Sequence, residues 1–200
     1  MDKTQAEHWE ERYRSDNIPW DTGEPEPELV RFIEEEGIQP GRLIELGCGT
    51  GSNSLWLAQQ GFDVTAVDIA ETALAVAESR VTTESVRYVQ GDVCDFSWDG
   101  EAFPWFFDRG CYHVVRRTHV AEYVQTLDRL TTADARGLIL TGNAREAHQP
   151  GPPVVSEEQL RTELGAVFDF LWLREFRFGA KKGSGDNFLG WSCFLRKKPR

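Results

Sequence analysis

The sequence has no excess of basic residues, and this absence excludes several classes of partner. Its 200 residues hold 22 Lys and Arg against 33 Asp and Glu, which gives a formal net charge of -11. Nucleic acids are held mainly by clustered positive charge, and so are anionic membrane surfaces. We therefore expect neither a nucleic acid nor a membrane as a partner.

The sequence also lacks the marks of a membrane segment or a metal site. No run approaches the roughly 20 consecutive apolar residues that span a bilayer, and the first residues carry no apolar signal region. The four cysteines stand singly, with no Cys-x-x-Cys pair and no histidine at ligand spacing beside them. These observations predict a cytoplasmic protein with reduced thiols and no bound metal. The cysteines are Cys48, Cys94, Cys111 and Cys193.

Short apolar runs alternate with helical patterns from residue 42 onward, after two helical patterns at 3–14 and 26–36. The predicted strands are 42–46, 63–67, 86–90, 105–108, 137–141, 168–178 and 191–195. The predicted helices between them are 52–60, 71–79, 120–130 and one that begins at Ser156. This alternation is typical of an α/β fold with a mostly parallel, seven-stranded sheet covered by helices on both faces. The connection between the last two strands is too short for a crossover helix, so the last strand is predicted to be antiparallel.

We see no domain boundary in the sequence. It predicts a single domain over residues 1–200, with 1–38 as an N-terminal helical cap and 39–200 as the core.

The strongest local signal is a glycine-rich turn after the first predicted strand. Residues 43–51 read Leu-Ile-Glu-Leu-Gly-Cys-Gly-Thr-Gly, and a helical pattern follows directly. Glycine lets the backbone turn sharply and lets a ligand approach main-chain atoms that a Cβ would block. The turn indicates a nucleotide-type ligand at the carboxyl edge of the sheet, and a purely structural tight turn is the alternative.

Three acidic residues follow the same edge. Asp68 ends the second predicted strand, where a carboxylate can accept both ribose hydroxyls of a nucleoside. Asp92 follows the third strand, where it can accept a hydrogen bond from an adenine amino group. Glu45 precedes the glycine turn, where it would repel a pyrophosphate but can anchor the ammonium group of a cofactor that carries an amino acid. A lone Asp at a strand end is more simply a helix cap, but the three together point to S-adenosylmethionine.

Two other nucleotide sites match the turn less well. It lacks the Lys-Ser or Lys-Thr that ends a P-loop, which argues against a nucleotide hydrolase. The dinucleotide fingerprint requires a third glycine three positions after the second, and Ser52 stands there. A nicotinamide dehydrogenase is therefore the weaker interpretation.

The glycine turn, with Asp68 and Gly91-Asp92 behind it, resembles the class I S-adenosylmethionine-dependent methyltransferases over roughly residues 25–198. The aromatic N-terminal segment, the run 107–110 and the proline-rich stretch 148–153 are similar to the thiopurine S-methyltransferase and the thiol and halide methyltransferase group. The resemblance implies a Rossmann-like doubly wound sheet, with S-adenosylmethionine as cofactor and S-adenosylhomocysteine as product. The cofactor-binding residues that it implies are Trp9, Tyr13, Trp20, Glu45, Gly47, Cys48, Gly49, Asp68, Ile69, Asp92, Val93 and Arg109.

Two residues are candidates for the acceptor side of the site. The resemblance implies that the backbone of Arg109 touches the cofactor and that its side chain faces the acceptor, as a catalytic residue. A salt bridge to Asp108 or Glu45 is the structural alternative. His113 is a candidate base for a thiol or hydroxyl near neutral pH, and a hydrogen-bonded structural histidine is its alternative.

The sequence thus predicts methyl transfer from S-adenosylmethionine to a small molecule, with a thiol or another soft nucleophile, thiopurine-like, thiol or halide, as the acceptor. One alternative is an O- or N-methyltransferase of a small metabolite, which needs a base. A second is a module that binds the cofactor without turnover. We expect a monomer or a weak homodimer.

Overall fold

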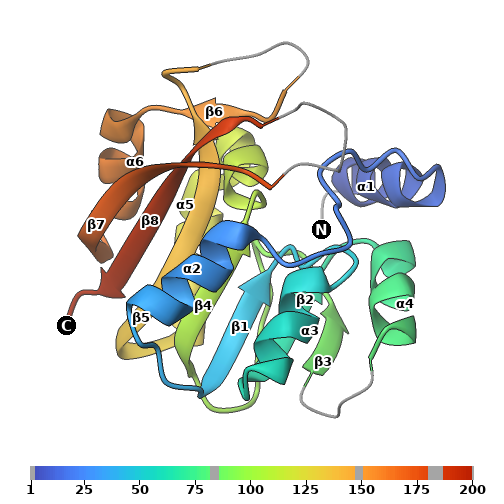
Figure 1. The fold of residues 1–200 in the computed structure, drawn as a ribbon, viewed down its shortest axis with the longest axis horizontal. Helices are drawn as coiled ribbons and strands as arrows, with labels where there is room; N and C mark the ends of the chain where they lie inside the picture. The colour runs from blue at the N-terminus through green and yellow to red at the C-terminus, as the bar shows by residue number, and fades with distance from the viewer. Residues whose placement is uncertain (1–2, 82–85, 147–150, 180–186, 200) are drawn as a thin grey trace.

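The computed structural model describes residues 3–81, 86–146, 151–179 and 187–199, which are built around one twisted sheet (Figure 1). Its strands are β1 (Arg42–Leu46), β2 (Asp63–Asp68), β3 (Val86–Gln90), β4 (Phe103–Arg109), β5 (Thr131–Asn143), β6 (Val154–Val155), β7 (Phe168–Arg177) and β8 (Leu189–Lys197). The order is β3-β2-β1-β4-β5-β8-β7. In this described sheet β8 runs antiparallel to both β5 and β7, and the other strand pairs are parallel. The predicted α/β class is confirmed, with the two-residue β6 beside β5 as an addition.

Helices cover both faces of the sheet, as the sequence predicted. They are α1 (Lys3–Arg14), α2 (Pro27–Glu35), α3 (Ser52–Gln59), α4 (Glu71–Ser79), α5 (Tyr112–Leu130) and α6 (Glu157–Leu164). One core cluster joins apolar side chains of α2 and α3 to β1 and β4, and the other joins α5 and α6 to the opposite face. Figure 1 shows α2 and α3 in front of the sheet. The helix predicted to begin at Ser156 is present as α6, and a capping box between Ser156 and Gln159 starts it.

The helix α5 begins earlier than its apolar pattern indicated. The prediction placed its start at Val120, whereas the helix begins at Tyr112 and has a non-helical residue at His119 (φ -136, ψ 39). Its first turn forms because the carboxylate of Asp108 accepts the backbone N–H groups of Cys111 (3.0 Å) and Tyr112 (2.9 Å). A cap supplied by the preceding strand leaves no signal in helical periodicity.

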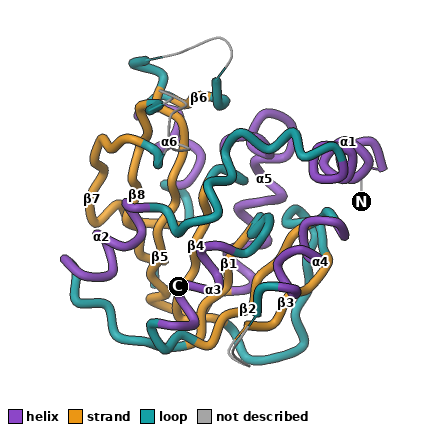
Figure 2. The backbone as a smooth tube through the Cα atoms, turned by 45° about the vertical axis from the view of Figure 1, so that its right-hand side comes forward, coloured by secondary structure: helices purple, strands orange, loops and turns teal. Residues whose placement is uncertain are grey.

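The carboxyl ends of the parallel strands meet at one edge of the sheet, because parallel strands all point the same way. Figures 1 and 2 both place α1 beyond this edge, close to α4, and the segment after α1 returns to α2 in front of the sheet. The turn at the end of α2 contains Gly37 in the left-handed conformation (φ 58), which glycine adopts readily. Within the described residues, no helix combines the length and the apolar character needed to cross a bilayer.

Candidate functional site

The glycine turn after β1 satisfies its own backbone amides. The N–H groups of Gly47 (2.8 Å) and Cys48 (3.0 Å) both donate to the carbonyl of Val67, and that of Gly51 donates to Cys48 (3.1 Å). The N–H of Gly49 donates to the Asp68 carboxylate (2.8 Å). A loop that binds phosphate needs amides that point at the ligand. These four amides are engaged within the protein, which argues against the dinucleotide interpretation.

Positive φ angles explain why glycine occupies this turn. Gly47 (φ 69) and Gly49 (φ 55) lie in the left-handed region. A Cβ on Gly47 would lie 2.5 Å from the Cβ of Cys111, and one on Gly49 would lie 2.8 Å from the hydroxyl oxygen of Tyr13. The turn is therefore packed against α5 on one side and against α1 on the other.

The carboxylate of Asp68 joins the end of β2 to this turn. One oxygen accepts the N–H of Gly49, and the other accepts the N–H of Ala70 (2.9 Å). Burial raises the pKa of Asp68, although the backbone hydrogen bonds oppose that effect. Each carboxylate oxygen has a second lone pair, so both can still accept a hydroxyl hydrogen. This arrangement suits a ribose diol.

Glu45 lies beneath the turn and is almost completely buried. It accepts hydrogen bonds from the hydroxyl of Ser54 and from the side-chain amide of Asn53 (3.4 Å). Burial raises the pKa of Glu45 to about 8, and the nearby Asp108 and Asp68 add to the rise. A buried carboxyl group of this kind gains most from a positively charged neighbour.

The three remaining predicted cofactor contacts near the sheet edge lie after β2 and β3. Asp92 is half-buried, and its side chain accepts the N–H of Cys94 (2.9 Å). Val93 is buried in the core, while Ile69 is half-buried and its carbonyl accepts the side-chain amide of Gln90 (3.2 Å). Asp68 and Asp92 thus stand at the ends of adjacent strands.

The predicted aromatic residues of the N-terminal segment form one cluster. Trp20 packs edge-on against Trp9 and Tyr13, with ring centroids 5.6 and 6.4 Å apart. The guanidinium of Arg12 lies over the Trp20 ring at 4.6 Å. Burial, with the nearby Asp68 charge, raises the pKa of Tyr13, so its hydroxyl is protonated at neutral pH. The cluster brings α1 and the loop after it to the glycine turn.

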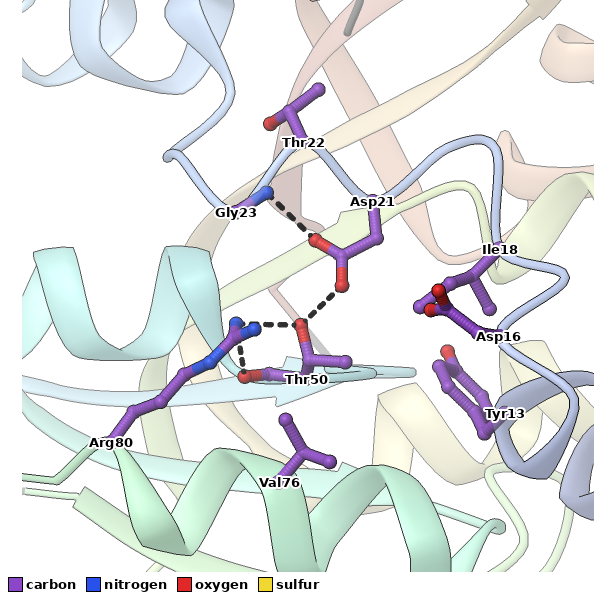
Figure 3. Close-up of a pocket in the computed structure, with 9 residues that line it drawn as sticks. All are labelled: Tyr13, Asp16, Ile18, Asp21, Thr22, Gly23, Thr50, Val76 and Arg80. Carbon is purple, nitrogen blue, oxygen red and sulfur yellow. Dashed lines mark hydrogen bonds between the residues drawn. The ribbon is translucent and has the colours of Figure 1, made fainter.

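A cavity of about 290 Å³ lies between this N-terminal loop and α4 (Figure 3). The hydroxyl of Thr50 donates to the carboxylate of Asp21 (2.7 Å) and accepts from Arg80 (3.0 Å). Glu45, Asp68 and Asp92 do not line this cavity. Tyr13 and Thr50 do line it, so the cavity adjoins the glycine turn, and sequence reasoning did not find it.

Arg109 forms an ion pair that the sequence did not predict. Its Nε donates to a carboxylate oxygen of Glu26 (2.7 Å), and its guanidinium lies 5.2 Å from the centre of the Phe178 ring. The predicted alternatives were Asp108 and Glu45, and neither is the partner. Glu26 stands between two prolines with no periodic pattern, so nothing in the sequence marked it as buried.

Asp108, at the end of β4, is a second buried acid whose role the sequence did not reveal. Besides capping α5, it accepts the hydroxyl of Tyr123 (2.7 Å). Burial raises its pKa to about 7, while the hydrogen bonds from Tyr123 and the backbone oppose the rise. It supports the glycine turn from below, because the start of α5 packs on Gly47.

His113 is buried, and its environment determines its tautomer. Its Nδ1 accepts the backbone N–H of Gly142 (3.0 Å). Burial lowers the pKa of His113 to about 3, helped by the positive charges of Arg109 and Arg116. The ring is neutral with its proton on Nε2, so it is a hydrogen-bond donor on that side. This geometry suits the structural alternative better than a base.

Two segments of the chain are incompletely described. Residues 147–150 of the proline-rich stretch and residues 180–186 of the loop before β8 lie outside the described residues. In the part of the chain that the structure describes, no group of three or more His, Cys, Asp or Glu side chains could hold a metal ion.

The donors and acceptors at this edge fit S-adenosylmethionine. Asp68 and Asp92 offer carboxylate acceptors after adjacent strands, and Glu45 is a buried carboxyl group next to the glycine turn. A family model for thiopurine S-methyltransferase matches residues 4–177. The chain belongs to the thiopurine S-methyltransferase family. This family is a group of class I S-adenosylmethionine-dependent methyltransferases, which agrees with the fold and with the internally satisfied glycine turn.

Individual methyltransferases are similar to this chain. A 2-heptyl-1-hydroxyquinolin-4(1H)-one methyltransferase of Mycobacteroides abscessus is 30% identical over 150 residues, which cover 72% of this chain and 65% of that protein. A thiopurine S-methyltransferase of Pseudomonas fluorescens is 24% identical over 182 residues, 82% of each chain. The chain therefore spans just under two thirds of the first relative.

A solved structure shares the fold over nearly the whole chain. It comes from work on the conversion of a disulfide bond into a thioacetal group during echinomycin biosynthesis. Its TM-score is 0.83 at 23% identity, and the match covers 96% of this chain and 91% of that one.

Proposed function

We propose that this chain transfers the methyl group of S-adenosylmethionine to a small-molecule acceptor whose nucleophile is a thiol or another soft atom. Membership of the thiopurine S-methyltransferase family over residues 4–177 carries the proposal. The buried acids at the ends of β1 and β2 support it, because they suit a cationic nucleoside cofactor. When bound, that cofactor supplies an electrophilic methyl group on a positively charged sulfur.

The site residues take the following roles in this proposal. Asp68 accepts the ribose hydroxyls, Asp92 accepts from the adenine amino group, and Glu45 stabilises the positive charge of the amino-acid end. The backbone of the glycine turn, at Gly47, Cys48 and Gly49, and the residues Ile69 and Val93 line the crevice.

The aromatic cluster and Arg109 complete the proposed site. Trp9, Tyr13 and Trp20 exclude water and present ring faces to the sulfonium, an interaction of about 0.5 to 2 kcal/mol. Arg109 lies at the end of β4, where it donates hydrogen bonds to the acceptor, while its backbone contacts the cofactor. His113 fixes the end of β5 by accepting the N–H of Gly142, and a soft nucleophile needs no stronger base than solvent when the site aligns it.

A transfer assay with labelled S-adenosylmethionine tests the proposal. We expect label to move to a thiopurine or to a simple aryl thiol. Saturable binding of S-adenosylhomocysteine without transfer to any thiol, halide, selenium or tellurium acceptor would instead favour a non-catalytic module. Saturable binding of a nicotinamide dinucleotide would favour a dehydrogenase.

A second acceptor class deserves the same assay, because one relative is named for a hydroxyquinolone. That molecule offers oxygen nucleophiles, on its N-hydroxyl group and its ring carbonyl, and no sulfur. Transfer to such a heterocycle, with none to thiols, would support the O- or N-methyltransferase alternative.

The other expectations remain predictions from the sequence. They are a cytoplasmic location, a monomer or weak homodimer without nucleic-acid or membrane partners, and one domain with residues 1–38 as a cap on 39–200. Light scattering coupled to size-exclusion chromatography tests the oligomeric state.

A further inference from the structure

The side chain of Arg109 is held by a buried carboxylate from the N-terminal segment. Glu26 is only 2% exposed. One of its oxygens accepts the Nε of Arg109 (2.7 Å), and the other accepts the backbone N–H of Gly179 (2.9 Å). Since the carboxylate divides its oxygens between two donors, it engages the guanidinium through Nε alone. The two terminal nitrogens of Arg109 have no hydrogen-bond partner within the described part of the chain.

Several contacts hold this pair in one geometry. The backbone N–H of Glu26 donates to the side-chain oxygen of Asn53 (2.8 Å), and Asn53 also reaches Glu45. The ring of Phe178 supports the guanidinium. A Cβ on Gly179 would lie 2.9 Å from Cδ of Pro27, so the backbone there packs closely on the segment that carries Glu26. The ion pair thus joins the N-terminal segment, β4 and the end of β7.

The Arg109–Glu26 pair combines two properties that a lone arginine cannot combine. No described residue occupies the terminal N–H groups of Arg109, so they can donate hydrogen bonds, and the net charge of the pair is zero because the Glu26 carboxylate lies in direct contact. An anionic acceptor gains little binding free energy from a neutral ion pair, since its repulsion by the Glu26 carboxylate offsets its attraction by the Arg109 guanidinium. A carbonyl or thiocarbonyl group still gains a well-oriented hydrogen bond.

We propose that Glu26 is a specificity-determining positioning residue, which makes the acceptor site select uncharged molecules with a carbonyl or thiocarbonyl group over anions. The proposal rests on the proposed function, in which Arg109 faces the acceptor. It narrows the acceptor class, because halide and thiocyanate ions become poor substrates of the native protein.

The test compares the wild-type chain with Glu26→Gln on two acceptors. Thiocyanate is the anion, and a thiopurine below the pKa of its ring N–H is the uncharged thiocarbonyl compound. We expect the ratio of kcat/KM for thiocyanate to that for the thiopurine to rise about tenfold or more in Glu26→Gln, mainly through a lower KM for thiocyanate. General damage to the structure would lower both values and leave the ratio unchanged.

Glu28→Gln is the matched control. Glu28 is also buried, but it pairs with Arg31 (2.6 Å) and not with Arg109. The control removes the same charge from the same segment, and its ratio should equal that of the wild type. A rise as large as that of Glu26→Gln would overturn the proposal, because net charge alone would then explain the effect. In the double variant Glu26→Gln/Arg109→Gln the gain should disappear, and its persistence would also overturn the proposal.

Folding is checked by thermal melting. If Glu26→Gln does not fold, Glu26→Asp is measured in the same way, because its shorter side chain draws the carboxylate back from Nε of Arg109. A ratio of kcat/KM values equal to that of the wild type then overturns the proposal. If the wild type is active and the ratio in Glu26→Gln equals that of the wild type, only the role of Glu26 is refuted. A wild type that binds S-adenosylhomocysteine but methylates neither compound refutes the soft-nucleophile function, and the inference with it.

Discussion

The hydroxyl of Thr50 donates a hydrogen bond of 2.7 Å to the carboxylate of Asp21, and so joins the N-terminal loop to the glycine turn. Arg80 donates to the same hydroxyl oxygen from the end of α4. One small side chain therefore connects three segments beside the crevice proposed for the cofactor. The position of the aromatic cluster depends on this connection, because Trp20 immediately precedes Asp21.

Replacing Thr50 should loosen the N-terminal loop. Thr50→Val keeps the shape of the side chain but removes both hydrogen bonds, so we expect faster amide hydrogen exchange over residues 16–23. Mass spectrometry of the exchanged peptides measures this. Thr162→Val is the control, because that hydroxyl bonds only a carbonyl within α6. Equal exchange in Thr50→Val and the wild type would show that the hydroxyl does not hold the loop.

Asp68 should account for a large part of cofactor affinity. Asp68→Asn keeps the size of the side chain but removes the charge that would accept two ribose hydroxyls, and one of its backbone partners loses its acceptor. We expect binding of S-adenosylhomocysteine to weaken by about 1 to 3 kcal/mol in calorimetry. Asp63→Asn, at the exposed start of the same strand, should bind like the wild type. Wild-type affinity in Asp68→Asn would refute the assignment of the ribose site.

Glu45 should make the ligand-free protein less stable at higher pH. Its pKa is about 8 in the folded chain against an ordinary 4.5, so the folded state holds a proton that the unfolded state has lost. Its contribution to stability is complete below the ordinary value and is lost as the pH rises through the folded value. Relative to Glu45→Gln, the wild type should lose free energy of unfolding between pH 4.5 and about 8.

Urea denaturation at a series of pH values measures this difference. Glu34→Gln, at the exposed end of α2, serves as the control and should follow the wild type at every pH. Parallel curves for the wild type and Glu45→Gln would mean that the buried carboxyl ionises in the folded state as it does in the unfolded state.

His113 should stabilise the fold and should not act as a base. His113→Phe leaves the N–H of Gly142 without its acceptor, and we expect a loss of about 1 to 3 kcal/mol of unfolding free energy. His113→Asn can place an oxygen near the position of Nδ1 and should recover part of that loss. The pH–rate profile of methyl transfer should show no change of slope near pH 6.5, the ordinary pKa of histidine. A change of slope near that pH in the wild type, absent in His113→Asn, would instead identify the imidazole as the base.

Much of the fold could be predicted because the signals are local. The alternation of apolar runs and helical patterns marked the strands and helices of the sheet, and the glycine turn with Asp68 and Asp92 marked the edge that we propose for the cofactor. The early start of α5 escaped prediction because Asp108, on the preceding strand, supplies the cap. The two-residue β6 escaped because so short a strand has no periodicity.

The sequence by itself determined the α/β class, the position of the glycine turn and the acids that follow successive strands, because each depends on neighbouring residues or on a regular spacing. Only the tertiary structure decided that Glu26 pairs with Arg109 and that Nδ1 of His113 is occupied by Gly142. These pairs join residues far apart in the chain, and their chemistry depends on burial, which lowers the dielectric constant and excludes water. The composition of the sequence and the spacing of its residues do not show how deeply a given side chain is buried.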